Sequence, residues 1–347
     1  MFTLSDASKE VKGILKWGLV IIILISLAFA IFRIGLIVKE MLYPTPPPPP
    51  TVLFSKLSQI VFPSNATVEK LEFKIKTISG SLPQTESQIS VYKIFTPKPD
   101  LLALDRIKQT AKKGKFDNGP YKVSETVFDF STNEDIVKTI RINTEDFNFQ
   151  VTSNYLQNED AVSGRNIPDE KKAIEMAKDY FSNLGYGSGD LDFENPLVNM
   201  LSIENGRFVK ATSLSNTKLV QVNFYKQNID DLPVYNERPT ESNVNVIIAG
   251  GNSAQIVAAI FINPDLSEES STYPLKTVGQ AFEELKNGKA YIASYFGEKP
   301  EVSITDAYLA YYLGRNEKNY VMPVIVFVGD DGFYAYVSAV RDEWIGN

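Results

Sequence analysis

The chain contains neither cysteine nor histidine. Without cysteine it has no disulfide, no thiolate nucleophile, no zinc–thiolate or iron–sulfur site and no lipid-modified N-terminal cysteine. Without histidine it lacks the commonest general base and the commonest transition-metal ligand, which excludes Ser-His-Asp and Cys-His catalysis within this chain. An exported eukaryotic domain of this size usually carries disulfides, so their absence favours a prokaryotic source.

Positive charge is also scarce. The chain has 35 Lys and Arg against 42 Asp and Glu; the first fifty residues hold five basic and three acidic side chains, which leaves 30 basic and 39 acidic residues, a net charge of −9, beyond them. Nucleic-acid and anionic-lipid binders need basic surfaces, so we expect no nucleic-acid partner. The roughly three hundred residues beyond position 50 are enough for two or three globular domains.

One hydrophobic run stands out. Residues 17–38 hold a single charged side chain, Arg33, near the far end, where it can reach the interface. The length meets the roughly 20 residues that a bilayer requires. The preceding residues 1–16 carry three lysines, and such a short basic tail favours the cytoplasm. The sequence therefore predicts a cell-membrane protein that spans the bilayer once, with a cytoplasmic N-terminal tail and an extracytoplasmic C-terminal domain.

A cleaved signal peptide is the alternative interpretation of this run. Ala28-Phe29-Ala30 fits a small-x-small cleavage site after a short apolar region. Cleavage there would leave the apolar sequence IFRIGLIVKEML as a new N-terminus, which a secreted protein does not need. We therefore favour an uncleaved signal anchor. Both interpretations export the C-terminal domain.

A proline-rich stalk is expected over 39–51, because Pro46–Pro50 is a run of five prolines. Such a run adopts a polyproline II helix and acts as a semi-rigid spacer. Placed after a membrane helix, it would lift the folded domain off the lipid. A ligand for SH3 or WW domains is the alternative, and it would need a cytoplasmic location.

The remainder reads as an α+β chain in which a helix followed by an antiparallel meander recurs three times. The expected units are 52–160, 161–265 and 266–347. The expected helices are 101–113, 169–184 and 277–286. Pro168 followed by acidic residues is typical of a helix start, and Gly185 is typical of a helix end.

Strands are expected where apolar and polar residues alternate or where apolar residues run together. The expected strands are 68–78, 87–95, 121–130, 136–142, 147–155, 208–213, 218–226, 243–249, 255–262, 301–313, 320–328 and 333–340. We interpret Asp330-Asp331-Gly332 as a hairpin turn and Asp230-Asp231 as a second turn, rather than as acidic sites.

Two of the expected helices contain alanines and end in glycine with an aromatic residue close behind. These residues are Ala103, Ala111 and Gly114-Lys115-Phe116, then Ala173, Ala177 and Gly185-Tyr186. The pattern, followed by a meander, resembles PepSY-type modules. Residues 278–342 are similar to the tail of the YycH/YycI group of membrane-anchored extracytoplasmic regulators, through a short amphipathic helix, the strand VSITDAYLAYYLGR and the hairpin YVMPVIVFVG-DDG-FYAYVSAV. The resemblance implies one N-terminal transmembrane helix and modulation of a sensor kinase or peptidase without catalysis.

Alternating acids form one candidate site, with Asp190, Asp192 and Glu194 at every second position. Alternating oxygen ligands are typical of a calcium loop. That loop also needs glycine at its sixth position and glutamate at its twelfth, where this chain has Asn195 and Leu201. We therefore interpret the segment as a polar connection between a helix and a strand.

Aromatic and proline residues mark a second candidate. Tyr308 and Tyr312 share one face of an expected strand and Tyr311 the other, so core packing is favoured over stacking on a glycan or peptide. Pro323 predicts a strand start or an edge, where a partner strand could add. Asn65-Ala66-Thr67 matches a glycosylation acceptor, which we attribute to chance, and Lys112-Lys113-Gly114-Lys115 is a helix end expected to stay solvated.

No reactive constellation emerges, so we predict no catalytic, cofactor-binding or metal-binding residue, no cofactor and no enzyme activity. The sequence favours a membrane-anchored extracytoplasmic binding or regulatory protein, whose partners are the lipid bilayer and a protein of the cell envelope. Two alternatives stay open: a structural subunit of a cell-envelope or surface assembly, and a cell-wall hydrolase that works through carboxylates alone.

Overall fold

The computed structural model describes residues 4–42, 48–64, 71–98, 100–187, 189–204 and 207–346. The chain divides into two units, Met1–Pro49 and Pro50–Asn347, each considered by itself. The Asn65-Ala66-Thr67 triplet and residues 43–47 of the predicted stalk lie outside the described residues.

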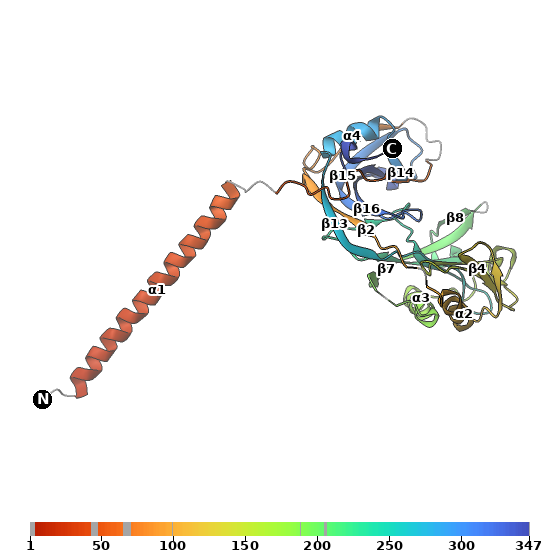
Figure 1. Ribbon diagram of the computed structural model, residues 1–347, viewed down its shortest axis with the longest axis horizontal. Helices are drawn as coiled ribbons and strands as arrows, with labels where there is room; N and C mark the ends of the chain where they lie inside the picture. The colour runs from red at the N-terminus through yellow and green to blue at the C-terminus, as the bar shows by residue number, and fades with distance from the viewer. Residues whose placement is uncertain are drawn as a thin grey trace. The chain divides into compact units, whose positions relative to one another are not determined.

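The N-terminal unit contains the helix α1 (Leu4–Leu42) (Figure 1). Within α1, the segment Trp17–Lys39 is 23 residues long, contains an 18-residue window with a mean hydropathy of 2.8, and is long and apolar enough to cross a membrane. A signal sequence near an N-terminus meets the same criteria. The apolar helix predicted over 17–38 is present, and since α1 continues to Leu42, residues 39–42 of the predicted stalk are helical.

The C-terminal unit is built on two sheets. The nine-stranded sheet has the order β3-β4-β5-β6-β12-β11-β9-β7-β8. Its strands are β3 (Asn118–Lys122), β4 (Val127–Ser131), β5 (Lys138–Asn143), β6 (Phe149–Ser153), β7 (Leu191–Glu204), β8 (Arg207–Lys210), β9 (Leu219–Lys226), β11 (Val244–Ala249) and β12 (Gln255–Phe261). The ladders between these strands are antiparallel.

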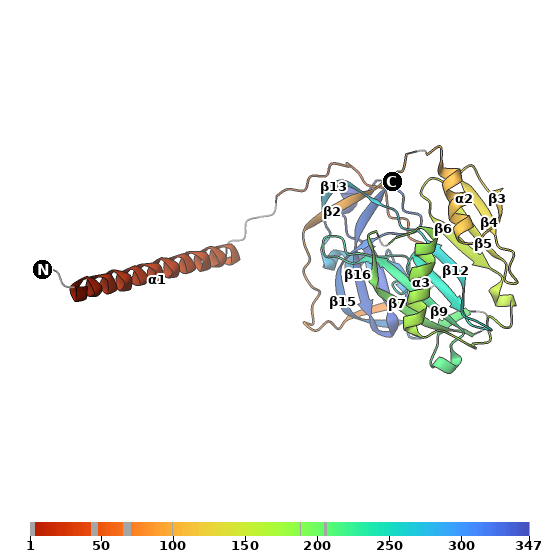
Figure 2. The same cartoon turned by 90° about the horizontal axis from the view of Figure 1, so that it is seen from below.

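Two helices, α2 (Ala103–Lys113) and α3 (Glu170–Leu184), cover one face of the nine-stranded sheet (Figures 1 and 2). Side chains alternate between the two faces of a strand. In β9, Val220, Val222 and Phe224 therefore point toward the helices and join their core. Burying this apolar face fixes the register, because a slip by one residue would turn it toward the other side.

The second sheet has eight strands, with the main order β1-β15-β16-β17-β14; β10 pairs with β15, β2 with β16, and β13 with β2. Its strands are β1 (Glu72–Ile75), β2 (Gln88–Ile94), β10 (Val234–Tyr235), β13 (Leu266–Pro274), β14 (Tyr291–Ser294), β15 (Glu301–Tyr312), β16 (Tyr320–Gly329) and β17 (Tyr334–Ser338). β1 and β10 run parallel to β15, and the other ladders are antiparallel.

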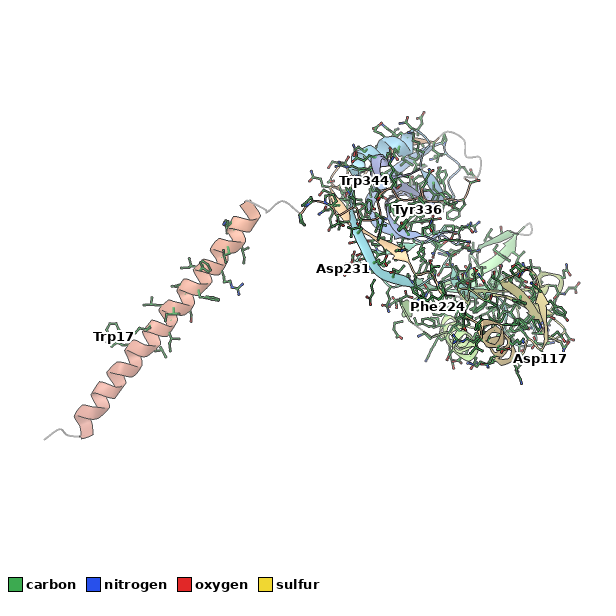
Figure 3. All side chains as sticks on the ribbon, viewed as in Figure 1. Trp17, Asp117, Phe224, Asp231, Tyr336 and Trp344 are labelled. Carbon is green, nitrogen blue, oxygen red and sulfur yellow. The ribbon has the colours of Figure 1, made fainter. Side chains whose placement is uncertain are left out.

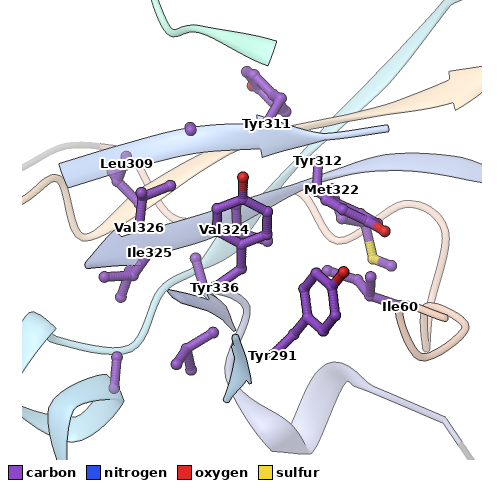
Figure 4. Close-up of a cluster of buried hydrophobic side chains, with 14 of the residues drawn as sticks. Ile60, Tyr291, Leu309, Tyr311, Tyr312, Met322, Val324, Ile325, Val326 and Tyr336 are labelled. Atoms are coloured by element: carbon purple, nitrogen blue, oxygen red, sulfur yellow. The ribbon is translucent and has the colours of Figure 1, made fainter. Parts of the chain in front are cut away.

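The centre of the eight-stranded sheet is buried on both faces, as the continuous apolar run of β16 indicates. The helix α4 (Val278–Lys286) covers one face, with the ring of Phe282 at 5.9 Å from that of Phe327. The opposite face carries an aromatic cluster that includes Tyr336 (Figure 4). Phe224 and Tyr336, both fully buried, mark the cores of the two sheets (Figure 3).

Pro323 is inside a central strand, so the predicted strand start or edge is wrong. β16 lies between β15 and β17. The opposite residue, Tyr311, donates its N–H to Pro233 O at 2.9 Å, so this pair exchanges no hydrogen bond. On the β17 side, Ala339 N–H donates to Pro323 O at 3.0 Å, and Ala339 O accepts from the Lys276 N–H at 2.8 Å. The N–H that proline lacks is therefore replaced by the Lys276 donor.

The helix ends agree with the sequence. Asp169 caps α3 by accepting from the Lys172 N–H at 2.8 Å, and Gly185 ends it with φ of 93°, a conformation that favours glycine. Thr277 and Gln280 form a capping box at the start of α4. Both predicted turns are confirmed: Asp230 and Asp231 have φ of 49° and 63°, and a turn joins β16 to β17.

Each helix of the C-terminal unit is followed by antiparallel strands, as expected. Hydrogen bonding nevertheless groups the strands differently from the segments 52–160, 161–265 and 266–347. The first two segments contribute to one nine-stranded sheet, while β1 and β2 of the first segment pair with strands of the third. Short 3₁₀ turns lie at Tyr155–Gln157, Leu214–Asn216, Asp330–Gly332 and Asp342–Trp344.

The chain enters this unit along the eight-stranded sheet. Leu53 N–H donates to Ser271 Oγ at 2.7 Å, and Leu57 N–H donates to Trp344 O at 2.8 Å. Leu57 is fully buried, and its carbonyl accepts from the Gly346 N–H at 2.7 Å. Hydrogen bonds thus join the first part of the unit to its last part at the edge of the core.

Candidate binding cleft

One irregular segment joins the two sheets. Residues 234–243, which we call the strap, belong to the connection from β9 of one sheet to β11, and this connection passes by way of the other sheet. At its start, Val234 and Tyr235 pair with the end of β15. Asn236 Nδ2 then donates to Leu313 O at 2.7 Å in a buried position. Several of the strap's other backbone groups are satisfied by side chains rather than by a sheet ladder.

Amide side chains on the nine-stranded sheet hold the other half of the strap. Asn223, fully buried, accepts the Ser242 N–H at 3.0 Å. Asn199 Nδ2 donates to Thr240 O at 3.0 Å. These side chains alternate with the apolar ones that face the helices, so they lie on the sheet's opposite face. The face without helices is therefore a hydrogen-bonding surface for the strap.

Tyrosines meet the strap from the eight-stranded sheet. The Tyr235 and Tyr308 hydroxyls are 2.8 Å apart, and the Tyr235 ring lies 5.8 Å from that of Tyr336. The buried hydroxyls of Tyr312 and Tyr336 have no hydrogen-bond partner within the part of the chain that the structure describes. Burial raises the pKa of both phenols well above its ordinary value, so both stay protonated.

A cleft of about 920 Å³ opens beside the strap. The strap forms one wall, and β14 with the segment after it forms another. The lining residues are Pro63, Ser64, Leu71, Glu237, Arg238, Glu241, Asn243, Tyr291, Ile292, Ala293, Ser294, Tyr295, Gly297, Glu298, Lys299, Pro300, Arg315 and Asn316. Its volume lies within the range of pockets that hold small ligands.

The walls are fixed to one another by hydrogen bonds. Arg315 donates its backbone N–H to Glu237 Oε1 at 2.6 Å and its Nε–H to Asn243 Oδ1 at 2.8 Å. Tyr291 OH donates to Glu237 O at 3.0 Å. Arg238 and Glu241 form an ion pair at 2.9 Å. The two sheets and the strap therefore present one connected polar surface to the cleft.

Among the described residues, the lining of the cleft holds three acidic and three basic side chains, so their charges balance. Burial raises the pKa of the Tyr291 phenol, which therefore remains a hydrogen-bond donor at neutral pH. Burial also raises the pKa of the Glu317 carboxyl behind the cleft, and the nearby Glu237 adds to this shift. The arrangement can bind polar or zwitterionic groups through charge-assisted hydrogen bonds.

The acids of the calcium-like segment already have protein partners. Asp190 forms an ion pair with Lys226 and accepts from Asn263 Nδ2 at 2.8 Å. Asp192 accepts the Glu194 N–H at 3.0 Å and the Asn195 side-chain amide at 2.9 Å. The Asn195 hydrogen bond lowers the pKa of Asp192. Among the described residues no group of three or more acidic side chains is arranged to hold a metal ion.

The other candidate residues have structural contacts. Tyr308 and Tyr312 lie on the face that meets Tyr235 and Tyr336, and Tyr311 lies on the opposite face, as predicted. The Tyr311 hydroxyl donates to Ser90 O at 2.8 Å. These contacts are those of core tyrosines.

Sequence reasoning missed the cleft. Its strap residues lie in the run NERPTESN, between two expected strands, and Arg315 follows a strand end. Polarity and a proline indicated only a loop. A stronger signal was available in β9, where Gln221 and Asn223 alternate with large apolar residues. Amides in a buried strand require partners, and here the partners include the strap.

Comparisons with known proteins leave the family open. No family model matches the chain, and no curated protein matches it. Among solved structures, an uncharacterized protein from Eubacterium rectale is similar at 13% identity and a TM-score of 0.34, covering 81% of this chain and 91% of its own. The Bacillus megaterium YpeB C-terminal domain is similar at 11% identity and a TM-score of 0.30, covering 71% of this chain and 95% of its own. Likeness at this level carries no argument about function.

Proposed function

We propose that the protein is a single-pass, membrane-anchored binding or regulatory protein whose C-terminal unit lies outside the cytoplasm and does not catalyse a reaction. The observation that carries this proposal is the cleft of about 920 Å³ at the strap, attached through one chain to an apolar helix of membrane-spanning length. The three lysines before Trp17 favour a cytoplasmic N-terminus. The resemblance of residues 278–342 to the YycH/YycI regulators favours the same class.

The cleft's own chemistry supports binding over catalysis. Arg238 and Glu241 neutralise each other, and Glu237 accepts from a backbone N–H. Burial raises the pKa of the Tyr291 phenol further above neutral pH, so it stays protonated. With no histidine or cysteine in the sequence, catalysis would have to rely on carboxylates, Lys or Tyr. A protein of the cell envelope is the partner we propose, since such a partner meets the C-terminal unit at the membrane surface.

Site-specific photocrosslinking in native membranes tests this proposal. A benzophenone amino acid replaces Asn316, which is exposed and lines the cleft, or Thr212, which is exposed and is not among the lining residues. We expect a discrete adduct from position 316 and none from position 212. Equal adducts from both positions, within a large complex that survives detergent, would favour the structural-subunit alternative instead.

A further inference from the structure

Arg315 is fixed at its base by a buried partner. Its Nε–H donates to Asn243 Oδ1 at 2.8 Å, and Asn243 is 4% exposed. Its backbone N–H is also engaged, with Glu237 Oε1 at 2.6 Å. A side chain held through its Nε, on a backbone that is itself held, loses less entropy when it binds a ligand, since its orientation is already restricted.

The two terminal nitrogens of this guanidinium have no hydrogen bond or ion pair within the described ranges of the chain, although Arg315 lines the cleft and is exposed. Arg238, in the same cleft, differs because it forms an ion pair with Glu241 at 2.9 Å. A guanidinium with its terminal N–H groups open matches the planar, two-oxygen geometry of a carboxylate.

The cleft is a poor platform for a neutral sugar. Sugars stack on the open faces of aromatic rings, but Tyr291 is 8% exposed and Phe62 stacks on it at 5.2 Å. The half-buried Tyr295 packs edge-on against Phe333 at 5.9 Å, and its hydroxyl donates to Lys299 O. The lining instead offers side chains of both signs. Peptides carry charges of both signs along one chain, so they complement this lining better.

We propose that the cleft binds a short peptide segment and that Arg315 receives a carboxylate of that peptide through its two terminal nitrogens. The proposal rests on the binding function proposed above and names its ligand class. The carboxylate belongs either to a peptide C-terminus or to an Asp or Glu side chain, which share this chemistry. Arg315 supplies the specific contact, and the strap holds it in place through Asn243.

The test uses the full-length chain in phosphatidylcholine nanodiscs and three pools of hexapeptides labelled with a dansyl group, which carries no carboxylate of its own. One pool ends in a free carboxylate and lacks Asp and Glu, the second ends in an amide and contains one Glu, and the third ends in an amide and lacks acids. Fluorescence anisotropy should show one or both acidic pools binding about tenfold more tightly than the third. The free energy of charge-assisted hydrogen bonds corresponds to about that ratio of dissociation constants. The ratio between the first two pools identifies the source of the carboxylate.

Two arginine variants make a matched pair for this test. Arg315→Gln should remove the preference for carboxylate, and Arg106→Gln should retain it, because Arg106 is exposed on α2 and is not among the residues that line the cleft. Arg315→Lys keeps the charge without the planar geometry and should give an intermediate preference. Thermal melts of each variant confirm folding. Equal binding of the three pools, or a preference that survives in a folded Arg315→Gln protein, would overturn the proposal.

A blocking variant separates this proposal from the broader one. Asn316→Trp fills the mouth of the cleft. If all peptide pools bind equally and Asn316→Trp abolishes that binding, the cleft binds peptides and the role of Arg315 is wrong. If chitotetraose binds and the peptides do not, the ligand class is wrong while binding stands. If no probe binds and position 316 gives no crosslink, both proposals fail.

Discussion

The two sheets of the C-terminal unit differ in the kind of side chain that their inner strands bury. β16, at the centre of the eight-stranded sheet, is buried over Val321–Phe327 and is apolar on both faces. β9, an inner strand of the nine-stranded sheet, is also buried along most of its length, but it alternates apolar residues with Gln221 and Asn223. Alternation in a strand therefore does not require an exposed face, since a polar segment of the same chain can cover it.

This difference explains where the cleft forms. Apolar faces pack closely and leave few voids. A face of amides must instead be matched by donors and acceptors, and the strap matches part of it through Thr240 and Ser242. The polar contact between the sheets leaves room for a charged cleft, whereas the core beneath α4 does not.

The largest expected effect contrasts a strand buried on both faces with one that is half exposed. Val326→Asp places an unpaired carboxylate at a fully buried position and should lower the free energy of unfolding by on the order of 4 kcal/mol, enough to unfold the unit. Gln150→Asp, at an exposed position of β6, should change it by less than about 0.5 kcal/mol. Thermal and urea melts measure both. Comparable losses would mean that position 326 of β16 is no more buried than position 150 of β6.

Alkaline pH should unfold the C-terminal unit, because tyrosines buried in it must ionise. Burial raises the pKa of Tyr92, in β2, and of Tyr155, beside the nine-stranded sheet, to about 12 each. A tyrosine with a raised folded-state pKa contributes stability that is complete below its unfolded value of about 10 and is lost as pH rises through the folded value. We therefore expect unfolding between about pH 10 and 12.

Absorbance at 295 nm and circular dichroism, followed together, check this prediction. Most phenolate should appear only as the sheet signal is lost, because the tyrosines around Tyr336 stay protonated while they are buried. Titration of most tyrosines near pH 10 with the circular dichroism unchanged would contradict the burial described here.

Removing one buried amide should have a smaller effect. Asn223→Ala deletes the acceptor of the Ser242 N–H and should lower the free energy of unfolding by about 1–3 kcal/mol, because a buried donor is left without a partner. The control is Asn252→Ala, at an exposed position, where we expect less than about 0.5 kcal/mol. Urea unfolding distinguishes them. If Asn223→Ala is neutral, the strap is not held by the amide face.

Millimolar calcium gives the smallest expected effect. Asp190 forms an ion pair with Lys226, and Asp192 accepts a hydrogen bond from Asn195, so carboxylate oxygens of both residues already have protein partners. The melting temperature should be the same in calcium as in a chelator, within about 1 °C, by mass action with no bound ion. A calcium-dependent increase of several degrees would show that the segment is a binding loop.

Much of the architecture could be predicted from local chemistry. Asp169 and Gly185 delimit α3 in the sequence and in the structure, and Thr277 starts α4, because caps depend on neighbouring residues alone. β7 and β13 were not predicted. Their sequences, LDFENPLVNMLSIE and LSEESSTYP, are rich in polar residues, and pairing with β9 and β2 holds them in the sheets.

The candidate site was harder to predict because it depends on distant contacts. Asn243 and Arg315 are separated by 72 residues yet share a hydrogen bond, and no local pattern links them. Pro323 was wrongly predicted to mark a strand start or an edge for a related reason. Its missing N–H is compensated by Lys276, which belongs to the segment before α4 and not to a neighbouring strand.

The central claim is that the chain is anchored in the membrane with its C-terminal unit outside the cytoplasm, and a measurement of topology tests it most directly. Because the sequence contains no cysteine, only an introduced cysteine can react with a maleimide. Single variants Ser8→Cys, in the N-terminal tail, and Ser215→Cys, at an exposed position of the C-terminal unit, are treated with a membrane-impermeant maleimide on intact cells stripped of outer layers. The account predicts that the cysteine at 215 is labelled in intact cells on a protein that stays in the membrane after carbonate washing, and that the cysteine at 8 is labelled only after permeabilisation. Labelling of position 8 but not of position 215 in intact cells, or release of the labelled chain into the soluble fraction, would contradict it.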